Sequence, residues 1–111
     1  MLIYQLPFAV EILNLVKYLK SQHKTIICNQ IGRAGTSIGA NIHEAQYAHG
    51  KADFVSKLQI ALKEACETEY WLRLLYRTEY ISKEQHNSMN QNVDELISML
   101  SAICKTAKDH K

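Results

Sequence analysis

The stretch that decides the fold is Ile26-Ile-Cys-Asn-Gln-Ile-Gly-Arg-Ala-Gly-Thr-Ser-Ile-Gly-Ala-Asn-Ile-His-Glu-Ala-Gln-Tyr47. Its three glycines argue for a loop, since a glycine inside a helix costs about 1 kcal/mol relative to alanine. The apolar residues argue for a helix, because they recur at alternating steps of four and three: Ile27, Ile31, Ala34, Ile38, Ile42 and Ala45. We therefore predict one continuous helix over this stretch.

The glycines of this predicted helix fall on a side next to the apolar one. Gly32, Gly35 and Gly39 form a stripe that carries no side chains. Such a stripe allows another helix to approach closely. We expect small residues in the middle of the following helix to meet it, namely Ala61, Ala65 and Thr68.

Composition bounds the class of protein. The chain has 111 residues, of which 47% are hydrophobic, and it contains one proline and four glycines. This predicts a single all-α domain over residues 1–111. The net charge of +2 neither identifies nor excludes a nucleic-acid-binding protein.

The distribution of cysteine and apolar residues indicates the cellular compartment of the protein. Cys28, Cys66 and Cys104 are odd in number and far apart, as expected of free thiols in a cytoplasmic protein. Polar residues interrupt the apolar residues at 1–19, so we expect neither a signal peptide nor a contact with a membrane.

Start and stop signals divide the chain into four helices, over about 7–22, 26–48, 51–78 and 83–108. Pro7 suits a first helical position, Thr25 an N-cap, and Gly50 the position after a helix end. Ser82 and Gln85 are spaced as a capping box. Because the connections are short, we predict an up-and-down antiparallel four-helix bundle.

Two helices have more apolar residues than one core needs. On the first helix we place Leu13 on the inner side, while Val10, Leu15 and Tyr18 extend the apolar surface beyond it. On the third helix three apolar residues lie opposite the inner side, and we predict that they form an oligomer interface: Ile60, Trp71 and Leu74.

Short motifs that suggest chemistry lack the rest of their pattern. Gly32-Arg-Ala-Gly35 has the G-x-x-G form of KH domains without their α/β context. His43-Glu-Ala-Gln-Tyr47 resembles the zinc motif H-E-x-x-H, but a tyrosine stands in place of the second histidine. A di-iron bundle needs Glu-x-x-His, which does not occur in the sequence. We therefore predict no catalytic residue, no metal and no cofactor.

Polar residues near the predicted core suggest a structural cluster. Glu69 lies at the border of the inner side of the third helix, where an unpaired carboxylate is costly. Arg33, Asn41 or Asn29 of the second helix could pair with it. We predict a polar cluster of Arg33, Asn41 and Glu69 that sets the register of these helices; a catalytic role is the alternative.

Three runs of sequence carry a family resemblance: Gly32 to Gln46, Lys51 to Phe54 and Ile60 to Leu72. Together they closely resemble the 23S rRNA intervening-sequence proteins. The residues at the positions expected to be characteristic of that family are Arg33, Ser37, Asn41, Glu44, Asp53, Phe54, Glu67 and Glu69.

The resemblance implies an up-and-down bundle that assembles as a ring, typically a homopentamer, and that is not an enzyme. It also implies an association with ribosomes or with retroelements. The related accessory proteins of diversity-generating retroelements bind nucleic acid and a reverse transcriptase. A reverse transcriptase or another protein is therefore a possible partner of this chain.

From the residues and the resemblance together we expect a non-enzymatic oligomer that binds RNA or DNA through a basic surface. Lysine and arginine would neutralise phosphates in such binding. The expected phosphate contacts are Lys17, Lys20, Lys24, Arg33, Lys51 and Lys57. The alternative is a structural or protein-binding module with no affinity for nucleic acid.

Overall fold

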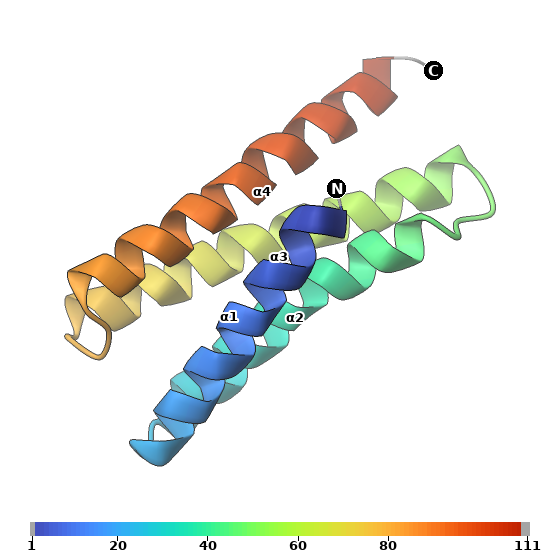
Figure 1. The fold of residues 1–111 in the computed structure, drawn as a ribbon. Coiled ribbons are helices and arrows are strands. Elements are labelled where there is room, and N and C mark those ends of the chain that lie inside the picture. Colours follow the sequence, from blue (N-terminus) through green and yellow to red (C-terminus); the bar gives the residue numbers. More distant parts are fainter. Residues whose placement is uncertain (1, 110–111) are drawn as a thin grey trace.

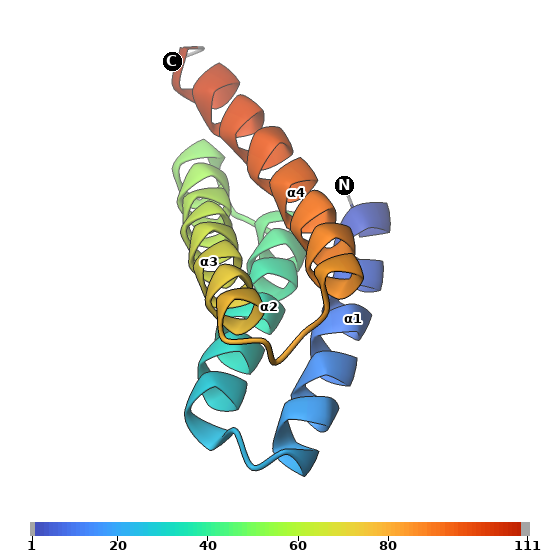
Figure 2. The ribbon, with the colours of Figure 1, turned by 90° about the vertical axis from the view of Figure 1, so that its left-hand side faces the viewer.

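The computed structural model describes residues 2–109, with side chains from residue 6 to residue 107. It contains the helices α1 (Leu2–Ser21), α2 (Thr25–Ala45), α3 (Lys51–Arg77) and α4 (Lys83–Asp109). Each helix runs antiparallel to the next, and the four form an elongated bundle of 47 × 21 × 21 Å (Figures 1 and 2). The predicted all-α four-helix bundle is confirmed.

Every helix contributes to one apolar core. Burying an aliphatic side chain contributes about 1.5–3 kcal/mol, so this core is the main source of stability. The largest fully buried side chains are Phe8, Ile12, Leu19, Ile31, Ile38, Ile42, Leu58, Leu72, Leu75, Val93, Leu96 and Leu100. Over the described residues, no helix combines the length and apolar character needed to cross a lipid bilayer.

The glycine-containing stretch is helical throughout, as its periodicity predicts. A Cβ atom added at Gly35 would lie 2.7 Å from Cγ1 and 2.8 Å from Cγ2 of Ile12 in α1. At Gly32 it would lie 3.2 Å from Cγ2 of Val16, also in α1. These two glycines therefore admit branched side chains of α1, and the expected pairing with small residues of α3 is wrong for them.

The start of α1 differs from the prediction. The helix begins at Leu2, and Pro7 lies inside it. Pro7 has no N–H to donate to the carbonyl of residue 3, so one backbone hydrogen bond is missing near the start of α1. The inner face of α1 also differs: Leu13 is exposed, whereas Leu15 is buried.

Two of the three connections use a left-handed residue that is not glycine. His23 has φ 60° and Glu79 has φ 66°. The N–H of Lys24 donates to the Leu19 carbonyl (3.0 Å), and the N–H of Tyr80 donates to the Leu75 carbonyl (2.9 Å). These are the hydrogen bonds of Schellman motifs, so α1 and α3 end in the same way at the same end of the bundle.

The ends of α2 also correct the prediction. Thr25 is the first helical residue rather than the N-cap, a position held by Lys24 without a side-chain hydrogen bond. The helix ends at Ala45, so Gly50 does not terminate it. Gly50 is instead the N-cap of α3, with an extended φ of 177°.

The capping box at the start of α4 is confirmed. The N–H of Ser82 donates to Oε1 of Gln85 (2.8 Å), and the N–H of Gln85 donates to Oγ of Ser82 (3.1 Å). These two reciprocal bonds satisfy backbone donors that the first turn leaves free.

Candidate nucleic-acid interface

The structure does not bring the six expected cations into one surface. Lys17 and Lys20 lie in the C-terminal half of α1, and Lys24 follows in the connection to α2. Lys51 and Lys57 lie in the first two turns of α3, toward the opposite end of the bundle (Figure 1). The six cations therefore do not share one environment.

The two lysines of α1 are the most available. Lys17 and Lys20 are exposed and are three residues apart, so they neighbour each other on the helix surface. Within the described part of the chain, neither forms an ion pair with a carboxylate.

Lys24 has an aromatic partner. Its Nζ atom lies 4.5 Å from the centre of the Tyr80 ring, which belongs to the α3–α4 connection. A cation over a ring face is attracted by the negative quadrupole of the ring. Lys24 therefore links the two connections at this end of the bundle.

The remaining expected cations have carboxylate partners or other contacts. Nζ of Lys57 lies 3.7 Å from Oε2 of Glu44. Nη1 of Arg33 lies 3.1 Å from Oε2 of Glu64, and Nη2 lies 2.6 Å from Oε2 of Glu67. Lys51 is exposed and has an interaction within the chain. These pairings partly neutralise Arg33 and Lys57.

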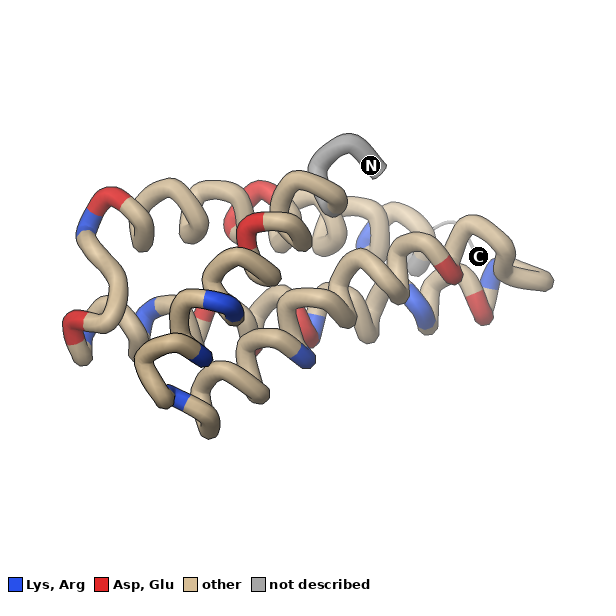
Figure 3. Tube along the Cα trace, turned by 60° about the horizontal axis from the view of Figure 1, so that its bottom comes forward, with Lys and Arg blue, Asp and Glu red and all other residues tan. Residues whose placement is uncertain are grey.

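The sequence around the free lysines contains no acid. Between Glu11 and Glu44 there is no aspartate or glutamate, and this run covers the second half of α1, the α1–α2 connection and most of α2. Figure 3 shows Lys and Arg positions, and no acidic ones, along this end of the hairpin. We call Lys17, Lys20 and Lys24 the hairpin lysines.

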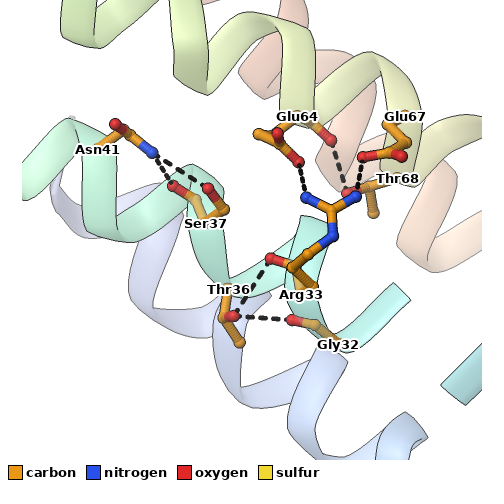
Figure 4. Close-up of polar contacts among 8 residues, drawn as sticks. All are labelled: Gly32, Arg33, Thr36, Ser37, Asn41, Glu64, Glu67 and Thr68. Carbon is orange, nitrogen blue, oxygen red and sulfur yellow. Dashed lines mark hydrogen bonds and ion pairs between the residues drawn. The ribbon is translucent and has the colours of Figure 1, made fainter. Parts of the chain in front are cut away.

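The polar cluster forms around Arg33, with different partners from those expected (Figure 4). Arg33 pairs with Glu64 and Glu67 of α3, and Glu64 is buried. Glu69 does not join this cluster; its Oε1 lies 3.8 Å from Nη2 of Arg73. The expected partner Glu69 is thus corrected to Glu64 and Glu67.

Asn41 also lies apart from the ion pairs. Its Nδ2 donates to the carbonyl oxygen (2.9 Å) and the hydroxyl (3.1 Å) of Ser37, one turn earlier in α2.

The spacing of Glu64 and Glu67 is a signal that could have identified the partners of Arg33, because residues three apart share one helix face.

The two kinds of carboxylate contact shift pKa values in opposite directions. The hydrogen bond from Arg33 lowers the pKa of Glu67 below its ordinary value of 4.5. The pKa of Glu69 is raised above that value, first by a hydrogen bond with Asp94 of α4 and then by burial. Glu67 is therefore stabilised as a carboxylate, and Glu69 is not.

The expected oligomer residues are only partly exposed. Ile60 is 39% exposed, whereas Trp71 is half-buried and packs against the core. Leu74 is also half-buried. The outer face of α1 is more open, with exposures of 65% at Leu6, 57% at Val10 and 51% at Leu13.

Within residues 6–107, no three His, Cys, Asp or Glu side chains are grouped as metal ligands would be. The three cysteines are free, with Cys28 buried and Cys66 exposed.

Comparison with known proteins agrees with this architecture. The sequence pattern of the 23S rRNA-intervening sequence protein family matches residues 5–102. A crystal structure of a protein of unknown function from the S23 ribosomal protein family of Bacteroides thetaiotaomicron superposes with a TM-score of 0.90. It is 53% identical, and the match covers 94% of this chain and 97% of that one. No protein with a curated description matches. The chain therefore belongs to the 23S rRNA-intervening sequence protein family.

Proposed function

We propose that this protein is a non-enzymatic, oligomeric interaction protein of the cytoplasm that binds RNA or DNA through the hairpin lysines. The observation that carries the proposal is the absence of acidic residues between Glu11 and Glu44, together with the absence of an ion pair at Lys17 or Lys20 in the described structure. Arg33 and Lys57 are weaker candidates because each already has an acidic partner.

The mechanism is electrostatic. Each lysine that neutralises a phosphate releases condensed counterions, so binding weakens as salt is added, with little dependence on sequence. One protomer offers few such contacts. Assembly into an oligomer, which we expect to be a pentamer, would repeat the hairpin lysines and strengthen binding through avidity.

The test compares two double variants with the same change in charge. Lys17→Glu/Lys20→Glu reverses two hairpin lysines, and Lys63→Glu/Lys105→Glu reverses two exposed lysines of α3 and α4. Fluorescence anisotropy with labelled single-stranded RNA and duplex DNA measures affinity across a salt series. We expect the hairpin variant to bind at least about tenfold more weakly, with a salt slope reduced by about 0.7–0.9 for each lost contact.

Equal weakening of the two variants would show that net charge alone governs binding and would overturn the assignment to the hairpin lysines. No binding of the parent protein even at low salt would favour the alternative, a structural or protein-binding module. Light scattering on the same samples tests the oligomer, because a monomer at micromolar concentration would contradict it.

A further inference from the structure

The seam between α1 and the start of α4 is open. It contains a groove of about 500 Å³, lined from α1 by residues including Leu15 and Tyr18 and from the α4 side by residues including Ile81 and Met89. Three of these form an apolar floor, and their exposures are 6% for Leu15, 5% for Ile81 and 7% for Met89. The other apolar core residues are 3% exposed or less. The core is thus most accessible at this groove.

The rim of the groove is acidic. Glu11 and Glu84 line it, whereas among the described side chains no lysine, arginine or histidine does. Nδ2 of Asn92 donates to Oε1 of Glu11 (2.6 Å) and ties α1 to α4 at this seam. Glu84 is exposed and has no ion-pair partner in the described part of the chain. An occupant with positive charge would complement this rim.

The floor has the length of a short helical contact. Ile81 lies just before α4 and Met89 lies in its second turn, so the floor extends over the first two turns of α4, about 10 Å at about 1.5 Å per residue. That distance accommodates two turns of a second helix, whose apolar residues at i, i+3 or i+4, and i+7 would meet the floor. Polar side chains that line the groove, such as Asn14 and Ser88, are available to hydrogen-bond the polar flanks of that helix.

We propose that this groove binds an amphipathic helix of a partner protein, in which lysine or arginine flanks an apolar ridge. Apolar contact with the floor supplies affinity, and the two rim carboxylates select the basic flanks. Nucleic acid does not fit this description, because the rim carboxylates repel phosphates. The inference is independent of the proposed binding of RNA or DNA, which uses the hairpin lysines.

The test uses two labelled helical peptides that differ only in charge. Both carry leucines at i, i+3, i+4 and i+7, with lysine at the flanking positions of one and glutamate at those of the other. Glu84→Lys reverses a rim charge, and Glu95→Lys is the matched control, an exposed residue of α4 outside the groove. Circular dichroism confirms that both variants are folded.

We expect the parent protein and Glu95→Lys to bind the lysine peptide and to bind the glutamate peptide more weakly. Glu84→Lys should weaken binding of the lysine peptide by about tenfold, which corresponds to about 1.4 kcal/mol, and should improve binding of the glutamate peptide. Failure of the parent to bind the lysine peptide, or equal effects of the two variants, would overturn the proposal. A loss of oligomer mass in Glu84→Lys would also overturn it, because a second copy would then be the occupant.

Discussion

Helices α2 and α4 each pack against two neighbours, but the two helices do so in different ways. On α2, Gly35 admits Ile12 of α1, and Arg33 pairs with two carboxylates of α3. On α4, Asp94 raises the pKa of another carboxyl, Glu69 of α3, and the seam with α1 contains an open groove. The difference shows that one bundle can combine a helix with closely fitted contacts and a helix whose seam with α1 stays open and acidic.

The largest effect should come from breaking the close contact of α2. Gly35→Ala places a Cβ less than 3 Å from branched atoms of Ile12, which cannot move aside as a flexible chain end could. Overpacking costs about 1–3 kcal/mol, and the helix propensity of alanine offsets about 1 kcal/mol of it. We expect a net loss of up to about 2 kcal/mol in the free energy of unfolding, measured by urea denaturation.

Two other glycines provide controls for that measurement. In Gly32→Ala the new Cβ would lie 3.2 Å from one side-chain methyl group, so the gain in helix propensity should roughly offset the cost of this close contact. Gly50→Ala meets nothing within 4 Å and lies in extended backbone. If Gly35→Ala is no less stable than these two variants, the close approach of α1 and α2 does not exist in solution.

A smaller effect should follow from weakening the ion pairs of α2. Glu67→Gln removes the carboxylate whose pKa Arg33 lowers. Because the site is partly exposed to solvent, we expect the free energy of unfolding at pH 7 to fall by only about 0.5–1 kcal/mol. Because the folded-state pKa lies below the unfolded value, this contribution is complete above about pH 4.5 and disappears as the pH falls through the folded-state pKa. Denaturation of parent and variant from pH 7 to pH 3 measures the difference, which should shrink on acidification. A difference that does not depend on pH would show that Arg33 does not stabilise the charge of Glu67.

The smallest effect, and one of opposite sign, should come from the contact between Glu69 of α3 and Asp94 of α4. Glu69→Gln removes a carboxylate whose pKa is raised by Asp94, so the variant should be more stable at pH 7 by up to about 0.5 kcal/mol. An acid with a raised folded-state pKa destabilises the folded state when ionised. The gain should therefore vanish as the pH falls from above the folded-state pKa to below about 4.5.

Asp94→Asn tests whether the two carboxyls act on each other. It should give a similar gain in stability at pH 7. Combining it with Glu69→Gln should add little, because both changes remove the same unfavourable interaction. A loss of stability on Glu69→Gln at pH 7 would instead support a favourable pairing of Glu69, as the sequence alone suggested.

Several features of this protein were determined by the sequence itself. The spacing of the isoleucines in α2 outweighed its glycines, and Ser82 with Gln85 located the start of α4. These signals are local: a helix fixes the positions of residues three and four apart, whatever surrounds it. The family could also be recognised from the sequence, because the three runs that resemble it are continuous segments in the region of α2 and α3.

Only the tertiary structure decided which residues meet across helices. Whether Arg33 pairs with Glu67 or Glu69, and whether Gly35 faces α1 or α3, depends on how each helix is rotated about its axis. That rotation is set by packing of the whole core, and a turn of a few tens of degrees exchanges one neighbouring residue for another. The groove between α1 and α4 has the same origin. The sequence predicts both helices, but it does not show that their facing sides fail to pack closely together.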